Sequence, residues 1–274
     1  MLVENFNFDT RQVLDETCEV HGYQLWLTKV PIKGRLEGLK QCPECTKAAI
    51  NIFENKLNSQ SKINSKLADT YAVFERDSLV SDKLRGKSLE NYEIKDEIDQ
   101  HAINYVKRME QFYRQDRTGN AIITGPSGVG KSHLTYGLAK YMNEQFKAYE
   151  SPKSVLFVSL VSLFTKIKES FKADNGYRQA DMIELLTRVD YLFLDDLGKE
   201  SRKGDSQNNE WTHQILYEIL DNRSNTIINT NLSSKEIKAL YADNYGNGAL
   251  SSRILEGVTG NSFAYPKDME DRRY

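Results

Sequence analysis

The chain has 274 residues, a formal net charge of -2, 28% charged residues and a mean hydropathy of -0.61. This composition is typical of a soluble globular protein with one large domain, or a large and a small one. It excludes a chain that binds nucleic acid through overall positive charge. The acidic N-terminus has no apolar run of signal-peptide length, and no stretch is long enough to span a membrane. We therefore expect a cytoplasmic protein.

The first 50 residues contain all three cysteines and are expected to form a small strand-and-turn unit. Cys18 and His21 are three positions apart, and twenty residues separate His21 from the C-x-x-C pair Cys42 and Cys45. Because each pair can lie on a tight turn, this spacing predicts a zinc-ribbon-like site with three thiolates and one imidazole. Four protein ligands leave no open position, so the site would be structural. A redox-active C-x-x-C pair, or a chance pairing of Cys18 with His21, are the alternatives.

Residues 51–77 are strongly polar, contain no glycine or proline and follow a helical pattern, which predicts a linker helix. The segment 78–274 is expected to be the main domain. Within it, short apolar strand patterns alternate with helical patterns. This alternation predicts an α/β fold with a parallel sheet that is covered by helices on both faces.

The stretch "GPSGVGKS" matches the phosphate-loop pattern G-x-x-x-x-G-K-[ST], and it lies between an apolar strand pattern and a helix. Glycines allow the tight turn that points several backbone N–H groups at one phosphate group. Lys131 is expected to contact the β and γ phosphates of ATP, and Ser132 to bind Mg²⁺. The predicted nucleotide-binding residues of this loop are Gly125, Pro126, Ser127, Gly128, Val129, Gly130, Lys131 and Ser132.

Two later strands end in polar side chains. The strand "YLFL" is followed by Asp195 and Asp196, and adjacent carboxylates at the end of a buried strand need a compensating cation. We expect Asp195 to hold Mg²⁺ together with Ser132, and Asp196 to polarise the attacking water. The strand "TIINT" leads to Asn231, which is expected to contact this water or the γ phosphate, with Thr230 as the weaker candidate. A polar strand end that only caps a helix is the alternative for Asn231.

The segment 164–178 combines basic and aromatic residues, a composition suited to single-stranded nucleic acid. An amphipathic helix that buries its apolar face is the slightly better interpretation. The segment "GKESRKG" after the Asp195–Asp196 pair is a second basic candidate. The side chains concerned in the first segment are Phe164, Lys166, Lys168, Phe171, Lys172, Tyr177 and Arg178.

Together, "GPSGVGKSHL", "YLFLDDLG", "TIINTNLS" and "LSSRILEG", in this order, resemble the DnaC/DnaI-type helicase loaders and the related IstB-type ATPases. These are AAA+ proteins, and the resemblance covers roughly 78–274. It implies ATP and Mg²⁺ as cofactors and self-assembly into a ring or spiral. It also implies that Arg253 reaches the ATP of a neighbouring subunit, and Arg272 or Arg273 resembles a terminal arginine of the family. Most AAA+ ATPases have glutamate where this chain has Asp196.

The resemblance implies an ATPase that loads a hexameric replicative helicase onto single-stranded DNA. DnaI-type loaders similarly carry a zinc-containing N-terminal domain that contacts the helicase, so residues 1–50 are expected to have this role. One alternative is an IstB-like transposition ATPase that works on duplex DNA. Another is an adaptor that binds the nucleotide without significant turnover, an interpretation that Asp196 leaves open.

Overall fold

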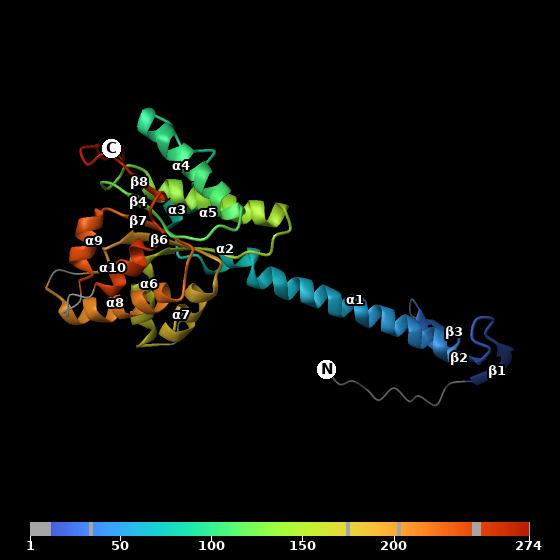
Figure 1. Cartoon of the computed structure of the whole chain (residues 1–274). Coiled ribbons are helices and arrows are strands. Elements are labelled where there is room, and N and C mark those ends of the chain that lie inside the picture. The colour runs from blue at the N-terminus through green and yellow to red at the C-terminus, as the bar shows by residue number, and fades with distance from the viewer. Residues whose placement is uncertain (1–11, 33–34, 174–175, 202–203, 243–247, 274) are drawn as a thin grey trace. The chain divides into compact units, whose positions relative to one another are not determined.

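The structure is a computed structural model that describes residues 12–32, 35–173, 176–201, 204–242 and 248–273 (Figure 1). The chain divides into two compact units, Met1–Ser65 and Lys66–Tyr274. The division falls inside the stretch 51–77, where the sequence pattern predicts a linker helix. Within the part of the chain that the structure describes, no helix is long and apolar enough to cross a membrane.

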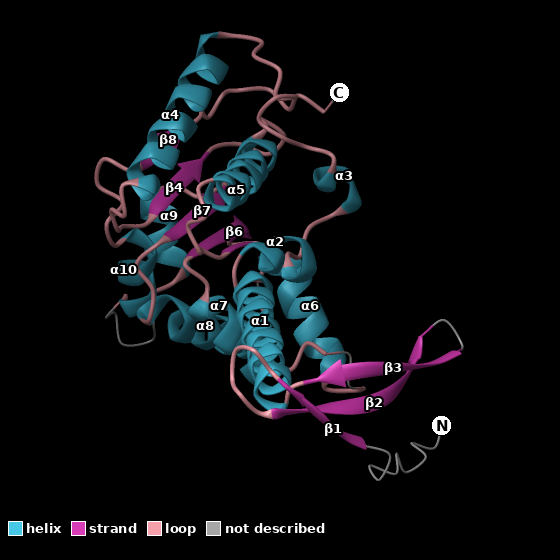
Figure 2. Ribbon diagram, turned by 90° about the vertical axis from the view of Figure 1, so that its right-hand side faces the viewer, coloured by secondary structure: helices cyan, strands magenta, loops and turns pink. Residues whose placement is uncertain are grey.

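The N-terminal unit contains a three-stranded antiparallel sheet and the start of a long helix (Figure 2). Two hydrogen bonds of 2.8 Å close the turn after the first strand, from Cys18 N to Tyr23 O and from Gly22 N to Cys18 O. Gly22 has a φ of +70°, which suits glycine in so tight a turn. The elements in chain order are β1 (Gln12–Thr17), β2 (Gln24–Ile32), β3 (Arg35–Gln41) and α1 (Pro43–Asp69).

The second unit is built on a five-stranded sheet in the order β5-β6-β7-β4-β8, and all four neighbouring pairs are parallel. This confirms the predicted α/β fold with a parallel sheet. The strand β7 lies between β4 and β6, so it separates the strand before the phosphate loop from the strand that ends in the two aspartates. The strands are β4 (Ala121–Thr124), β5 (Val155–Ser159), β6 (Tyr191–Leu197), β7 (Thr226–Thr230) and β8 (Ser262–Ala264).

Helices cover both faces of this sheet (Figure 1). Along β6, Leu192 and Leu194 join one apolar cluster with residues of α6, α7, α8, α9 and α10, whereas Phe193 joins a second cluster with residues of α4 and α5. Successive side chains of a strand point to opposite faces, so a doubly covered strand is apolar throughout. The helices are α2 (Tyr71–Asp77), α3 (Asp82–Arg85), α4 (Glu97–Arg114), α5 (Lys131–Ala148), α6 (Leu160–Ser170), α7 (Gln179–Arg188), α8 (Ser206–Asp221), α9 (Ser234–Leu240) and α10 (Ala249–Leu255).

Candidate nucleotide site and candidate zinc site

The phosphate loop connects the end of β4 to the first turn of α5. Its glycines Gly125, Gly128 and Gly130 have backbone φ values of +153°, +83° and +100°. Residues with a Cβ atom rarely adopt such values. No side chain caps the N-terminus of α5, an 18-residue helix that starts at Lys131. The free N–H groups and the positive end of the helix dipole therefore suit an anion such as a phosphate.

Lys131 is buried at the centre of this loop, with 7% of its surface exposed. Its ammonium group donates hydrogen bonds to the carbonyl oxygens of Gly125 and Pro126 and to Asn231 Oδ1, at 2.8, 2.7 and 2.7 Å. Burial lowers the pKa of Lys131 to about 8, because the charged form loses its hydration. The structure thus brings Lys131 and Asn231 together from two different segments, as the predicted roles of these residues require.

Asp195 lies next to Ser132, the other residue predicted to hold Mg²⁺. Its Oδ1 atom accepts hydrogen bonds of 2.8 Å from Ser132 Oγ and from Asn229 Nδ2. Burial raises the pKa of Asp195, although the hydrogen bonds from Asn229 and Ser132 act in the opposite direction. A divalent cation would favour the ionised carboxylate, so the hydroxyl and the carboxylate together fit Mg²⁺ beside a triphosphate.

Asn229 is a member of this site that our sequence reasoning missed. It lies in β7, directly between the strands that carry the phosphate loop and Asp195, and its Nδ2 atom is also 2.5 Å from Thr135 Oγ1. Its side chain therefore orients Asp195 from the neighbouring strand. The available signal was the amide of Asn229, which directly follows the apolar pair "II" in "TIINT". A buried amide requires a polar partner.

Asp196 follows at the end of β6 in a left-handed conformation, with a φ of +63°. Its Oδ1 atom forms an ion pair of 2.6 Å with Lys199 Nζ. Both side chains line a cavity of about 230 Å³, together with Lys131, Ser132 and Asn231. Lys131, Ser132, Asp196 and Asn231, which the sequence predicts for different roles, therefore face a single cavity. Asp195 lines an adjoining cavity of about 460 Å³ together with Ser132 and Asp196.

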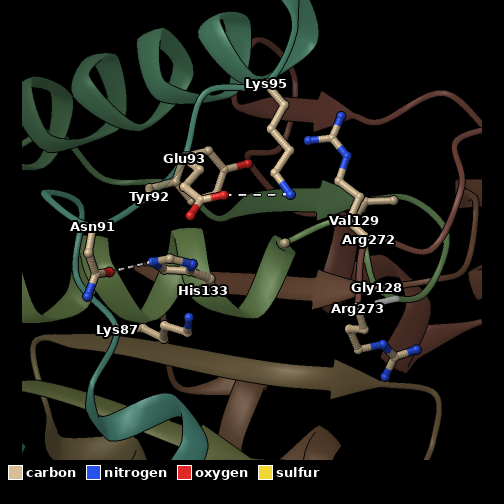
Figure 3. Close-up of a pocket in the computed structure, with 11 residues that line it drawn as sticks. Lys87, Asn91, Tyr92, Glu93, Lys95, Gly128, Val129, His133, Arg272 and Arg273 are labelled. Atoms are coloured by element: carbon tan, nitrogen blue, oxygen red, sulfur yellow. Dashed lines mark hydrogen bonds and ion pairs between the residues drawn. The ribbon is translucent and has the colours of Figure 1, made fainter.

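A second cavity of about 300 Å³ continues from the first along the start of α5 (Figure 3). The segment before α4 forms its other wall, where Asn91 Oδ1 lies 2.9 Å from His133 Nε2, and the Tyr92 hydroxyl lies 3.0 Å from the Tyr265 hydroxyl. The two cavities share Gly128, Gly130, His133 and Arg273. A phosphate chain in the first cavity would thus leave the second cavity for the nucleoside part of the same ligand.

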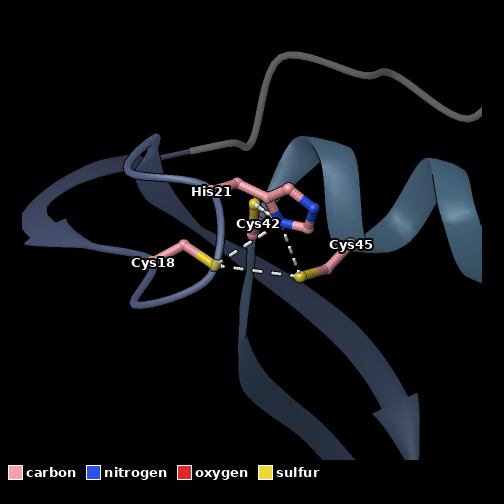
Figure 4. A group of neighbouring side chains, drawn as sticks. All are labelled: Cys18, His21, Cys42 and Cys45. Atoms are coloured by element: carbon pink, nitrogen blue, oxygen red, sulfur yellow. Dashed lines mark hydrogen bonds between the residues drawn. The ribbon is translucent and has the colours of Figure 1, made fainter.

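The four predicted zinc ligands converge in the N-terminal unit (Figure 4). Cys18 Sγ lies 3.8 Å from Cys45 Sγ, and His21 Nδ1 lies 3.8, 3.8 and 3.3 Å from the sulfur atoms of Cys18, Cys42 and Cys45. A tetrahedron with Zn–S bonds of 2.3 Å has edges of about 3.8 Å. The ligand atoms therefore have the spacing that a single Zn²⁺ requires.

The thiols of this cluster differ in how readily they ionise. Backbone hydrogen bonds from His21 and Val20, followed by the His21 side chain, lower the pKa of Cys18 to about 6. The hydrogen bond with Cys18, above other causes, raises the pKa of Cys45 to about 11. One thiolate therefore forms easily, while a second beside it needs a cation, which a bound Zn²⁺ supplies.

Comparison with known proteins places the second unit in a family. The sequence profile described as IstB-like ATP binding protein matches residues 72–262, which is more than half of the chain. The chain belongs to the IstB-like ATP-binding proteins. This membership confirms the resemblance to IstB-type ATPases, and a phosphate loop between β4 and α5 agrees with ATP binding.

Proteins that are similar to this chain carry the name of helicase loaders. The "Replicative helicase loader DnaC" of Buchnera aphidicola subsp. Acyrthosiphon pisum is 23% identical over 199 residues, covering 71% of this chain and 76% of the relative. The protein of the same name from Buchnera aphidicola subsp. Baizongia pistaciae is 27% identical over 168 residues, covering 57% of this chain and 60% of the relative. A crystal structure of the DnaC helicase loader is 21% identical, with a TM-score of 0.49, and covers 67% of this chain and 98% of that one.

In this IstB-like protein, Arg253 lies near the N-terminal end of β4, whereas the phosphate loop follows the C-terminal end of that strand. Its backbone carbonyl accepts a hydrogen bond of 2.9 Å from Asn120, which comes just before β4. Its guanidinium group pairs with Asp221 and Glu256 at 2.7 and 3.1 Å. Four residues of β4, about 13 Å of strand, separate the two ends. Arg253 therefore does not contact the nucleotide site of its own chain.

The C-terminal arginines do lie beside the phosphate loop. Arg272 N donates a hydrogen bond of 3.3 Å to Gly128 O, and its guanidinium group pairs with Asp96 and the buried Asp99. Arg273 Nη2 donates to Ser127 Oγ at 3.2 Å, and its side chain lines both cavities. Arg272 thus anchors the tail to α4, whereas Arg273 lines both cavities.

Within the segment 164–178, the structure describes residues 164–173 and 176–178, which include both buried and exposed side chains. Phe164 is buried, as the amphipathic interpretation expects, but Phe171 is 63% exposed. Lys168 Nζ lies 5.2 Å from the ring centre of Trp211, and Lys166 Nζ lies 4.4 Å from that of Tyr177. Cations stacked on rings are suited to a nucleic-acid strand but are equally common as surface packing.

Proposed function

We propose that this protein is an ATPase that loads a replicative helicase onto single-stranded DNA. The observation that carries the proposal is the match to proteins named replicative helicase loader DnaC. For the protein of Buchnera aphidicola subsp. Acyrthosiphon pisum, this match extends over 71% of the present chain. Membership of the IstB-like ATP-binding family and the cavity around Lys131 agree with an ATP-driven role. Loading a closed helicase ring requires work on a partner, which nucleotide binding and hydrolysis can supply.

The residues around the cavity divide the chemistry of hydrolysis among them. Lys131 and the phosphate loop would bind the phosphate chain, and Ser132 with Asp195 would hold Mg²⁺, which neutralises charge on the β and γ phosphates. Asp196 is the base that orients the attacking water, and Asn231 holds either that water or the γ phosphate. Because aspartate is shorter than the usual glutamate, we expect slow turnover without the helicase and DNA.

Arg253 completes the site of a neighbouring subunit in this proposal. Arg253 lies at the end of β4 that is remote from the phosphate loop, which excludes a role in the nucleotide site of its own chain. Its side chain is 38% exposed. A cation supplied by a second chain stabilises charge on the transferred phosphoryl group and makes hydrolysis depend on assembly. The pairs with Asp221 and Glu256 would then be exchanged for the phosphate on assembly.

The N-terminal unit would serve as the contact with the helicase. Its four convergent ligands fit a structural Zn²⁺, and so small a unit gains much of its stability from metal. Exposed apolar side chains on it include Val20 at 78% and Phe53 at 61% exposed. Apolar groups of this kind are commonly found at protein–protein interfaces.

The proposal is tested by loading a purified hexameric helicase onto single-stranded DNA and measuring the bound helicase with and without ATP. We expect this protein to increase the amount loaded, and Lys131→Ala to abolish the ATP dependence. The matched variant Lys107→Ala, on the exposed face of α4, should behave as the wild type. No association with the helicase under any nucleotide condition would overturn the proposal.

The proposed role of Arg253 in the nucleotide site of a neighbouring subunit has its own test, in which two inactive variants are mixed. Lys131→Ala subunits lack a working nucleotide site but keep Arg253, and Arg253→Ala subunits have the reverse defect. We expect the mixture to recover ATPase activity that neither variant has alone. A mixture as inactive as its components would contradict the assignment.

A transposition ATPase is the second candidate, since the family profile that matches is IstB-like. In this case, duplex DNA and a transposase would stimulate ATP hydrolysis, whereas a helicase would not. The same ATPase assay, with each partner in turn, decides between the two functions.

A further inference from the structure

Lys199 belongs to a turn that directly follows the strand carrying Asp195 and Asp196. Asp196 and Gly198 have positive φ values of +63° and +100°, and Lys199 N donates a hydrogen bond of 3.1 Å to Asp196 O. The chain therefore reverses within four residues. This reversal returns the Lys199 ammonium group to within 2.6 Å of the Asp196 carboxylate.

The buried carboxylate of Glu200 anchors this turn through hydrogen bonds. Glu200 has only 6% of its surface exposed, and it accepts a hydrogen bond of 2.8 Å from Gly198 N and another from the hydroxyl of Tyr241, a buried residue that follows α9. Burial raises the pKa of Glu200, because the charged carboxylate loses its hydration. These contacts anchor the backbone of the turn, and the ion pair with Asp196 places the Lys199 side chain at the cavity.

Lys199 lines the first cavity, of about 230 Å³, at the end where the terminal phosphate of ATP is expected. The second cavity, of about 300 Å³, is assigned to the nucleoside and lies along the segment with Tyr92. Neither Lys199 nor Asn231 lines this second cavity. A phosphate chain that starts in that direction and follows the loop ends between Lys131, Asp196, Lys199 and Asn231. Lys199 is thus a second lysine at the γ end of the site.

The charges at this end also favour an added anion. Lys131 and Lys199 both line this cavity, so two positive charges face the same space. Two cations that repel each other bind a phosphate placed between them more strongly than either does alone. The Asp196 carboxylate is the group that balances Lys199 in the present structure.

We propose that Lys199 binds the terminal phosphate of ATP, and that it holds Asp196 in an ion pair when no terminal phosphate is present. The proposal rests on the proposed ATPase function, and it assigns to one lysine the ability to distinguish ATP from ADP. When Lys199 turns to the phosphate, Asp196 loses its partner and becomes available to orient the water. With ADP, the ion pair persists and the carboxylate stays occupied.

The test compares the binding of ADP and of a non-hydrolysable ATP analogue, both with Mg²⁺, by titration calorimetry. For Lys199→Gln we expect an affinity for the analogue that is lower by roughly ten- to hundredfold, the usual scale for a hydrogen bond to a charged group, with unchanged affinity for ADP. Lys199→Arg should restore most of the difference, because arginine keeps the charge. The matched control is Lys107→Gln on the exposed face of α4.

A merely structural role would lower both affinities together, and this result would overturn the proposal, as would two affinities equal to those of the wild type. Thermal unfolding of Lys199→Gln should match the wild type, because 46% of the lysine side chain is exposed. These measurements need neither helicase nor turnover. If the wild type binds both nucleotides but Lys199→Gln keeps the same preference, only the Lys199 proposal fails. A wild type that binds no nucleotide overturns both proposals.

Discussion

The ammonium group of Lys131 donates a hydrogen bond of 2.7 Å to Asn231 Oδ1, which joins the phosphate loop to the segment after β7. Two loop carbonyls accept the other hydrogen bonds of Lys131, so the lysine keeps its place without Asn231. For Asn231→Ala we therefore expect little change in ATP binding. The turnover rate should fall by roughly a hundredfold, the scale of losing one hydrogen-bonding group at a reacting centre.

Steady-state ATPase assays and nucleotide binding on the same Asn231→Ala preparation check this prediction. Asn104→Ala is the matched control, because Asn104 is exposed on α4. A variant with wild-type turnover would assign Asn231 to the alternative role of a polar strand end.

Nucleotide binding should take up a proton at alkaline pH. Burial lowers the pKa of Lys131 from 10.5 to about 8, whereas bound phosphates favour its charged form. Below about pH 7, Lys131 is charged in both the free and the bound protein, and no proton is exchanged. At pH 9, most of the free protein carries neutral Lys131, so binding requires protonation and the affinity for ATP falls as pH rises. Calorimetry in two buffers of different ionisation enthalpy, at pH 7 and pH 9, measures the uptake; equal uptake at both would refute the assignment.

The local features of the candidate site can be recognised in the sequence because each is contiguous. The phosphate loop and the Asp195–Asp196 pair are each encoded within a few residues, and the alternation of apolar patterns predicts the parallel sheet. The order of the strands is not contained in any segment: β7 lies between β4 and β6 through long-range pairing. For this reason Asn229 and Lys199 escaped prediction as members of the site, and the tail with Arg273 was recognised only by resemblance. Their roles depend on which segments meet in space.

The buried pair of Glu200 and Tyr241 should contribute measurably to stability. Tyr241→Phe removes the hydroxyl that donates to a carboxylate with 6% of its surface exposed. A buried acceptor that loses its donor costs about 1–3 kcal/mol, so we expect the free energy of unfolding to fall by this amount. Urea denaturation checks the value. Tyr217→Phe, at a position on α8 that is 37% exposed, should leave the free energy unchanged.

Gly137 is required for the segment before α4 to approach α5. A Cβ atom at this position would lie 2.9 Å from Leu89 N and 3.0 Å from the carbonyl carbon of Ser88, which are backbone atoms that cannot rotate away. Alanine is the better helix former by about 1 kcal/mol, yet we expect Gly137→Ala to destabilise the protein, because overpacking costs roughly 1–3 kcal/mol. Thermal unfolding shows whether Gly137→Ala is less or more stable than the wild type. Gly86→Ala, where a Cβ atom meets nothing within 4 Å, is the control and should be nearly neutral.

The N-terminal unit should contain one zinc ion per chain and should depend on it for folding. Its ligand atoms all lie within 4.8 Å of one another, and its small sheet offers little apolar core. Binding of structural zinc contributes on the order of 10 kcal/mol, so removal by a chelator should unfold this unit while the second unit keeps its structure. Metal analysis and limited proteolysis measure the two effects. His21→Ala should lose the metal, whereas His101→Ala, on the exposed face of α4, should keep it. A zinc-free wild type that resists proteolysis in residues 12–58 would contradict the metal site, and would favour the redox interpretation of Cys42 and Cys45.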